Sequence, residues 1–262
     1  MDVRGKIAIV TGSGGLGSGR AYARRLARAG ATVVVSDIDV PGGHGTVRLI
    51  ESDGGRAAFR RTDIGDRSDV QALVDFAVRE FGGLDILVNN ASPAYHANEP
   101  LDWWFEPIEI DLLGAMAAMK FAIPVMRSRG GGAIVNIGST SAVGHGRKHS
   151  KSPAYDVAKA GLARVTTTLG WLRESDNIRV NCLVPDWIAV PEVVEYWNAL
   201  TPQQRREQNV PAELTTLDEV ADALLELVTN EQLAGRIMIW WSGQPRQLIA
   251  AGDPGYANVE EA

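Results

Sequence analysis

The chain has 262 residues, of which 45% are hydrophobic, and a formal net charge of -6 at pH 7. This length suits one large α/β domain. The acidic balance, without a long run of one sign, argues against binding to nucleic acid or to an anionic membrane surface.

The N-terminal residues and the cysteine count indicate the cellular compartment. Cys182 is the single cysteine, so no internal disulfide can form, which fits a reducing cytoplasm. The first residues lack the apolar stretch of a signal peptide, and no apolar run is long enough to span a bilayer. We therefore expect a cytoplasmic protein without a membrane partner. Residues 251–262 are rich in Gly, Pro, Asn and acids and read as a tail beyond a domain at 1–250.

The first third of the chain has the order of a dinucleotide-binding unit. Residues 7–10 form an apolar strand pattern, residues 20–29 a helix pattern, and residues 31–37 a second strand that ends in Asp37. Glycines allow a tight turn that approaches a pyrophosphate, and a helix N-terminus offers free N–H groups. Asp37 can accept hydrogen bonds from both ribose hydroxyls and repels a 2′-phosphate, which favours NAD over NADP. The turn residues expected at the cofactor are Gly12, Gly15, Leu16, Gly17 and Gly19.

This order resembles the short-chain dehydrogenase/reductase family, which opens with T-G-x-x-x-G-x-G. Counting back from the helix places the last two glycines at Gly17 and Gly19 and leaves one extra residue after Gly12. Counting forward gives Gly12, Gly15 and Gly17 with one residue too few. The first alignment is preferred because Gly30 then lies at the family's usual distance from Gly19.

The next two strands are expected at residues 57–64 and 84–91, with an amphipathic helix at 68–81 between them. The resemblance implies that Asp63 and Ile64 lie at the adenine ring, although Asp63 also suits a turn or helix cap. Residues 89–92 resemble the family's N-N-A-G segment, with Ser92 in place of the glycine. Asn90 and Ala91 would then lie along the cofactor ribose, and a structural role for a buried Asn is an equal alternative.

A long helix is expected over residues 101–126, and Asp111 stands where the family has an asparagine that organises a proton-relay water. The resemblance therefore implies a catalytic position for Asp111. We predict that Asp111 interacts with Lys159 and offsets part of its charge. An exposed helix acid is the alternative.

Ser139, Tyr155 and Lys159 form the predicted catalytic group. Ser139 ends a strand at residues 132–139, and Tyr155 and Lys159 are four apart on a predicted helix, so they share one face. A neighbouring cation lowers the pKa of a phenol, which suits proton transfer to or from a substrate oxygen. Ser139 would hold that oxygen. The resemblance also implies that Tyr155 and Lys159 lie at the cofactor, where Lys159 binds the nicotinamide ribose hydroxyls. Taken alone, the Tyr–Lys pair also suits ordinary packing of an amphipathic helix.

The last third resembles the family's cofactor and substrate segments. The strand at residues 178–185 ends in Pro185, Asp186 replaces the family's glycine, and the resemblance places Ile188 at the nicotinamide. Residues 187–211 are expected to form a mobile substrate lid. Aromatic and apolar side chains in and before this lid suggest a bulky apolar substrate, with helix packing as the alternative: Trp103, Trp104, Trp187, Val193, Val194, Tyr196, Trp197 and Leu200.

Two further segments are distinctive. The segment between Ser139 and Tyr155 is basic and suits an acidic substrate group, a neighbouring subunit or plain solvation; it carries His145, Arg147, Lys148, His149 and Lys151. Beyond the helix at residues 217–227 and the strand at 237–241, residues 246–262 extend past the family's usual end.

The sequence thus predicts a Rossmann-type, doubly wound parallel sheet of about seven strands in a three-layer αβα single domain. The resemblance implies an NAD-dependent oxidoreductase that interconverts a secondary alcohol and a ketone, with no metal and as a homo-oligomer, a dimer or homotetramer. A lyase, an epimerase or a dehalogenase on the same fold, and a non-catalytic NAD-binding scaffold, are the alternatives. Lys159 and the glycine turn with Asp37 argue against a dehalogenase that uses no cofactor.

Overall fold

The computed structural model describes residues 1–93, 104–143, 152–250 and 252. In this part of the chain, eight strands form one sheet with the order β3-β2-β1-β4-β5-β6-β7-β8. The strands are β1 (Ile7–Thr11), β2 (Thr32–Asp37), β3 (Arg56–Arg61), β4 (Ile86–Asn89), β5 (Gly132–Ile137), β6 (Ile178–Pro185), β7 (Ile237–Trp240) and β8 (Gln247–Leu248).

Strands β1 to β7 are parallel, and the short β8 pairs antiparallel with β7. The central strands β1, β4, β5 and β6 are buried along their whole length. Continuous apolar runs of this kind are expected where helices cover both faces of a parallel sheet. The predicted doubly wound fold is therefore confirmed.

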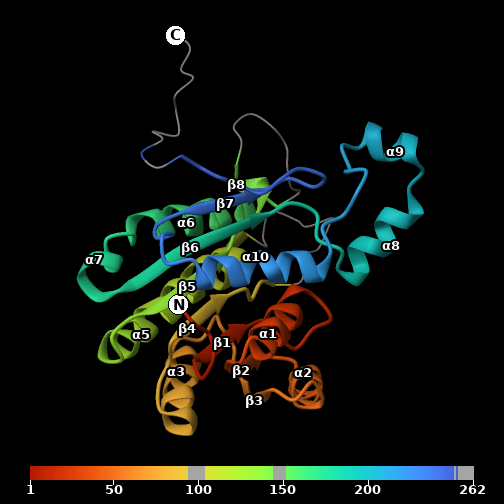
Figure 1. Cartoon of the computed structure of the whole chain (residues 1–262). Coiled ribbons are helices and arrows are strands. Elements are labelled where there is room, and N and C mark those ends of the chain that lie inside the picture. The colour runs from red at the N-terminus through yellow and green to blue at the C-terminus, as the bar shows by residue number, and fades with distance from the viewer. Residues whose placement is uncertain (94–103, 144–151, 251, 253–262) are drawn as a thin grey trace.

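The helices divide into two layers around this sheet (Figure 1). Helices α1, α2 and α10 pack on one face, and α3, α5 and α6 pack on the other. The helical segments are α1 (Ser18–Arg28), α2 (Val40–Ser52), α3 (Arg67–Phe81), α4 (Phe105–Pro107), η2 (Ile108–Gly114), α5 (Ala115–Ser128), η3 (Thr140–Ala142), α6 (Pro153–Thr168), α7 (Leu172–Asp176), α8 (Pro191–Ala199), α9 (Pro202–Glu207) and α10 (Leu217–Thr229).

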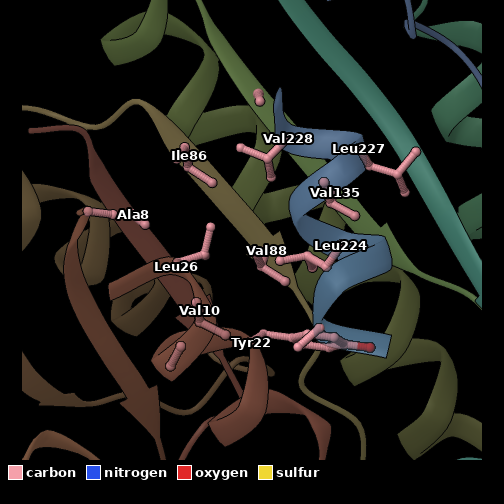
Figure 2. Packing of buried hydrophobic residues seen from close by; sticks show 14 of the residues in the cluster. Ala8, Val10, Tyr22, Leu26, Ile86, Val88, Val135, Leu224, Leu227 and Val228 are labelled. Carbon is pink, nitrogen blue, oxygen red and sulfur yellow. The ribbon is translucent and has the colours of Figure 1, made fainter. Parts of the chain in front are cut away.

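The core of the first layer lies where α10 crosses the sheet. Leu224 and Val228 of α10 lie over Val88 and Val135 of the central strands, and all four side chains are buried (Figure 2). Fully burying a side chain of this size contributes about 1.5–3 kcal/mol. The amphipathic pattern of α10 thus fixes that helix on the sheet.

Several sequence predictions need correction. The long helix expected at residues 101–126 is interrupted by η2, a π-helical segment, and its described part runs on to Ser128. The helix of Tyr155 does not continue to Glu174, because α6 ends at Thr168 and α7 follows after a turn. Neither α2 nor β8 was predicted.

The segment after β6 contains α8 and α9, which lie beside each other to one side of the sheet (Figure 1). No helix among the described residues has the length and apolar character needed to cross a bilayer. The predicted tail at residues 251–262, the basic residues between Ser139 and Tyr155, and Trp103 lie outside the described residues, apart from Gly252.

Candidate active site

The sequence-predicted site residues gather at one edge of the sheet. The glycine turn follows β1, Asp37 ends β2, Ser139 follows β5, and Asp186 follows β6. Because these strands are parallel, their carboxyl ends share one edge. The strand order reverses between β1 and β4, and ligands of doubly wound folds bind at such a switch point.

The glycine turn packs so closely that two of its glycines cannot carry a side chain. Gly12 has a φ of +65°, and a Cβ there would lie 2.6 Å from Ala91 Cα. A Cβ on Gly19 would lie 2.0 Å from the Gly12 carbonyl oxygen. Helix α1 begins at Ser18 with Gly17 as its N-cap residue, which provides no side-chain acceptor. This geometry fits the alignment in which Gly17 and Gly19 are the last two glycines.

The tip of this turn is open. Leu16 is 63% exposed and Gly15 is also exposed, so both face the space in front of the α1 N-terminus. The N-terminal amides of a helix attract anions through their free N–H groups and the helix dipole. The turn therefore combines a close backbone approach with an anion-binding helix end.

Asn90 connects β4 to the glycine turn. Its side-chain amide donates to the carbonyl oxygens of Thr11 and Gly12, each at 3.0 Å, and its Oδ1 accepts from Ser18 Oγ at 3.0 Å. The Ala91 N–H donates to Thr11 Oγ1 at 3.1 Å. The Asn90 side chain thus serves as a structural pin, as the alternative interpretation proposed.

Asp37 is half-buried, and both of its oxygens accept backbone hydrogen bonds. Oδ2 accepts from the Gly14 N–H at 2.7 Å, and Oδ1 accepts from the Asp39 N–H at 2.9 Å. The contact with Gly14 was not predicted from the sequence. The extra residue in the glycine turn was the sequence feature that could have indicated this contact.

The two residues expected at the adenine have different surroundings. Asp63 Oδ1 accepts from the Gly65 N–H at 2.9 Å, and the Asp63 N–H donates to Asp69 Oδ2 at 3.0 Å, which is the pattern of a turn acid. Ile64 is buried against the helices of the second layer.

Lys159 and Asp111 form a buried ion pair. Lys159 Nζ lies 2.7 Å from Asp111 Oδ1, and the two side chains are 4% and 0% exposed. The ammonium also donates to the Ile137 carbonyl oxygen at 3.0 Å and lies 5.4 Å from the centroid of the Tyr155 ring. The predicted contact between Asp111 and Lys159 is therefore present, and the exposed-acid alternative is wrong.

These charges act on the phenol in opposite directions. Burial raises the pKa of Tyr155 and outweighs the Lys159 ammonium, which lowers it. The Asp111 carboxylate raises this pKa further, and a hydrogen bond with Ser139 lowers it. The pKa of Tyr155 therefore lies above its ordinary value of 10.0, which corrects the expectation of a lowered value.

Lys159 keeps its charge despite burial. Burial alone disfavours the ammonium, but Asp111 and Tyr155 together outweigh this effect, so the pKa of Lys159 is raised. The site thus contains a protonated phenol beside a stable cation.

The π-helical segment η2 places Asp111 at this position. The wider turns of a π-helix re-aim side chains and are frequent at functional sites. Asp111 Oδ2 is buried and has no hydrogen-bond partner among the described residues. It borders a small hollow that Thr11, Asn89 and Lys159 also line. As the side chains lie, this hollow has no room for a water molecule, and the Asp111 oxygen stays buried among mostly apolar neighbours.

Ser139 follows β5 as the N-cap residue of η3, and its Oγ accepts from the Ser141 N–H at 3.2 Å. Gly138 stands where the family usually has another serine. A Cβ there would lie 2.9 Å from Val184 Cγ2 and 3.0 Å from Cys182 Sγ. Packing between β5 and β6 therefore accounts for this departure.

Asp186 joins the ends of three strands, a role the sequence did not reveal. Its Oδ1 accepts from Thr140 Oγ1 at 2.9 Å, next to Ser139, and its Oδ2 accepts from the Ser242 N–H at 3.2 Å. Its own N–H donates to the Trp240 carbonyl oxygen at 2.9 Å. The residue that replaces the family's glycine thus supports the segment that carries Ser139.

The chain that follows folds back over the glycine turn. Pro185 is buried at the end of β6, and Ile188 forms a bridge with Thr215. A Cβ on Gly17 would lie 3.4 Å from Val190 Cγ1, so Val190 covers the N-cap of α1. This segment therefore borders the predicted cofactor site.

Aromatic side chains hold the predicted lid together. The rings of Trp187 and Tyr196 stack with centroids 6.1 Å apart. Trp197 donates to the Pro211 carbonyl oxygen at 2.9 Å, and the Arg205 guanidinium lies 3.2 Å from its ring centroid. Helix packing therefore explains Trp197, while Trp187 and Tyr196 remain candidates for substrate contact.

Comparisons with known proteins agree with this arrangement. The family model for enoyl-(acyl carrier protein) reductase matches residues 15–236. The chain is 36% identical over 231 residues to cis-4-hydroxycyclohexanecarboxylate dehydrogenase from Sinomonas cyclohexanicum, which covers 86% of this chain and 90% of that protein. It is 32% identical over 259 residues to 7α-hydroxysteroid dehydrogenase from Escherichia coli K12, which covers 96% of each.

A solved structure shares the fold and much of the chain. The structure of 7α-hydroxysteroid dehydrogenase complexed with NADH and 7-oxo glycochenodeoxycholic acid has a TM-score of 0.81 and 29% sequence identity. The similarity covers 92% of this chain and 96% of that one.

Across the part of the chain that the structure describes, no group of three or more His, Cys, Asp or Glu residues is placed to hold a metal ion.

Proposed function

This chain belongs to the short-chain dehydrogenase/reductase family and is an oxidoreductase of CH–OH groups, and we propose that it transfers hydride between NAD and a cyclic secondary alcohol or ketone. The observation that carries the proposal is the cluster of Ser139, Tyr155 and Lys159, with the hydrogen bond and close charge that join them. These groups supply a donor, an acid/base and a cation at the carboxyl edge of the sheet.

Tyr155 is the proposed general acid/base. In ketone reduction the phenol donates its proton to the substrate oxygen, and in alcohol oxidation the phenolate accepts it. The raised pKa of Tyr155 keeps the phenol protonated near neutral pH, so reduction has its acid ready and oxidation should speed up as pH rises. Lys159 stabilises the phenolate when it forms.

Ser139 and Asp111 have supporting roles. The Ser139 hydroxyl reaches the phenol and would hydrogen-bond the same substrate oxygen, which fixes that oxygen for proton transfer. Asp111 holds Lys159 in place and moderates its effect on Tyr155.

The residues present fit a dinucleotide. Gly12 and Gly19 let the turn pack tightly, a Cβ on Gly15 would meet open space, and the adjacent end of α1 would accept the pyrophosphate. Asp37 would bind the adenosine ribose hydroxyls, which favours NAD over NADP. When bound, NAD supplies the hydride acceptor, and the protein orients the substrate and moves the proton.

The proposed substrate is a ring-bearing secondary alcohol. Two relatives, by their names, act on a hydroxycyclohexane carboxylate and on a hydroxysteroid. The stacked Trp187 and Tyr196 of this chain offer flat apolar surfaces beside the segment that follows β6. Such surfaces suit a bulky, largely apolar ring.

We also propose that the chain works as a homo-oligomer, a dimer or a homotetramer, in the cytoplasm. Phe105 is 74% exposed and Val157 is 60% exposed, on α4 and α6. Large exposed apolar side chains on packed helices often mark a subunit contact. Light scattering of the purified full chain would test this proposal, and a monomer at micromolar concentration would contradict it.

The function is tested with a panel of alcohols and the full chain. Cyclohexanol, 4-hydroxycyclohexanecarboxylate, a 7α-hydroxysteroid and an open-chain secondary alcohol are each offered with NAD⁺ and with NADP⁺, and formation of the reduced cofactor is followed by absorbance. We expect turnover of ring alcohols with NAD⁺. Tight NADH binding without turnover of any panel member would support the non-catalytic scaffold instead.

A further inference from the structure

Gly14, in the lengthened glycine turn, contacts the residue at the carboxyl end of β2. The Gly14 N–H donates to Asp37 Oδ2 at 2.7 Å. We propose that Gly14 is a positioning residue, which locks the Asp37 carboxylate for the adenosine ribose and so sets selectivity for NAD over NADP. This inference rests on the proposed cofactor site.

The lengthened turn is held from its other side. Arg20 Nη2 donates to the Gly14 carbonyl oxygen at 2.6 Å, and Arg20 Nε donates to Thr46 Oγ1 at 2.9 Å. The fully buried Thr46 hydroxyl in turn donates to the Ser13 carbonyl oxygen at 2.7 Å. Helices α1 and α2 thus fix the peptide units on both sides of Gly14, so its N–H is aimed before any ligand arrives.

The Asp37 carboxylate, which accepts this N–H, can still accept hydrogen bonds from ribose hydroxyls. Each Asp37 oxygen accepts one backbone N–H, Oδ2 from Gly14 and Oδ1 from Asp39. A carboxylate oxygen has two lone-pair directions, so each oxygen can still accept from one ribose hydroxyl. A carboxylate fixed by two amides cannot rotate away from a 2′-phosphate, whose charge it repels. The same two amides therefore fix the position of the Asp37 carboxylate and its selectivity for NAD over NADP.

Position 14 needs glycine for this contact. A Cβ there would lie 2.9 Å from Asp37 Cγ and 3.1 Å from Asp37 Oδ2, closer than a side chain tolerates. The backbone of Gly14 does not have a positive φ, so alanine would introduce no backbone strain. Gly14→Ala therefore acts on Asp37 through one methyl group.

A matched control is available on α2. Gly45 also lacks a positive φ, and a Cβ there would meet only Arg20 Nη2 at 3.7 Å and Arg48 Nη2 at 3.8 Å, which are ordinary contacts. Gly45→Ala makes the same chemical change without reaching Asp37.

The experiment is calorimetric titration of the full chain with ADP-ribose and with 2′-phospho-ADP-ribose, which contain no nicotinamide and report no turnover. Gly14→Ala should weaken ADP-ribose binding by about tenfold or more, because the displaced Asp37 carboxylate loses charged hydrogen bonds to the ribose hydroxyls. Binding of the 2′-phospho ligand should weaken much less, so the selectivity ratio falls. Gly45→Ala should keep the wild-type affinities.

The outcomes separate the two proposals. If Gly14→Ala keeps the wild-type ratio of the two affinities, the positioning role is overturned even though the cofactor site stands. If the wild-type chain binds neither ligand, the proposed cofactor site itself fails.

A second variant guards against a folding defect in Gly14→Ala. Thr46→Val keeps the shape of the side chain and removes the hydroxyl that joins Arg20 to Ser13. It should also weaken ADP-ribose more than the 2′-phospho ligand, by several-fold. Unchanged affinities for both ligands in Thr46→Val, with a melting temperature near that of the wild type, would overturn the inference.

Discussion

Replacement of Asp111 by asparagine removes one buried charge and leaves the shape of the side chain nearly unchanged. Asp111 Oδ1 lies 2.7 Å from Lys159 Nζ, which lies 5.4 Å from the Tyr155 ring centroid. The Asp111 carboxylate raises the pKa of Tyr155. Asp111→Asn should therefore lower that pKa, because the phenolate loses a neighbouring negative charge and the Lys159 cation is no longer offset.

The size of the effect follows from the distances. Because the two contacts share Lys159, Asp111 Oδ1 lies no more than about 8 Å from the Tyr155 ring centroid, and two unit charges at that limit interact by about 2 kcal/mol at an effective dielectric constant of about 20. Water and the bound cofactor screen part of this energy, so we expect about a tenfold effect on the phenolate population.

The assay is the pH dependence of kcat for alcohol oxidation at saturating NAD⁺. Oxidation needs the phenolate, so the acid limb of the profile should move to lower pH in Asp111→Asn. At a fixed pH on that limb, the rate should rise by about tenfold.

Asp85→Asn is the control, because Asp85 is also buried and ion-paired but pairs with Arg129 and Lys6 just before β4 begins, at the opposite edge of the sheet. It should lower the melting temperature without moving the profile. An acid limb that stays in place in Asp111→Asn, or moves to higher pH, would refute the coupling between Asp111 and Tyr155. A move to higher pH would mean that the unpaired Lys159 had lost its charge.

Three further predictions concern stability. Arg179 is buried and donates to the Leu227, Val228 and Asn230 carbonyl oxygens at the end of α10. Arg179→Met should therefore lower the free energy of unfolding in denaturant by about 3 kcal/mol. The control Arg173→Met, at an exposed arginine, should lower it by under about 1 kcal/mol, and equal losses would contradict the prediction. Gly138→Ser should cost about 1–3 kcal/mol because its Cβ would crowd Cys182 and Val184, and unchanged stability would contradict that packing. Burial raises the pKa of the Cys182 thiol from 9.0 to about 12, so the unfolded chain loses this proton at a lower pH than the folded chain does. The free energy of unfolding should therefore fall by about 1.4 kcal/mol per pH unit above pH 9. Cys182→Ala should flatten this pH dependence, and an unchanged slope in the variant would contradict the prediction.

Much of the fold could be predicted because local patterns of apolar residues determine where most of its strands lie. Apolar runs predicted six of the seven parallel strands, since a strand covered on both faces needs apolar side chains throughout. The third strand, β3, lies at the edge of the sheet, is rich in arginine and is only partly buried. β8 has two exposed residues and no such pattern, so the sequence could not reveal it. Three glycines within residues 42–45, with two more at 54–55, likewise obscured α2, a helix held by packing more than by intrinsic propensity.

The contacts within the predicted site followed from the sequence only in part. The contact of Asp111 with Lys159 followed from the family resemblance, and the structure contains it. The direction of the Tyr155 pKa did not follow, because burial outweighs Lys159 and burial depends on every element packed around the ring. The Gly14 contact with Asp37 depends on how α2 seats the longer turn, which the spacing of glycines alone cannot express.

The most direct test of the central claim compares kcat with NADH affinity for Tyr155→Phe and the wild type on the same preparations. General acid/base catalysis is worth about 100- to 10,000-fold, so removing the hydroxyl should lower kcat by at least about 100-fold while the NADH dissociation constant changes little. A Tyr155→Phe enzyme that oxidises a ring alcohol at the wild-type rate would contradict the account.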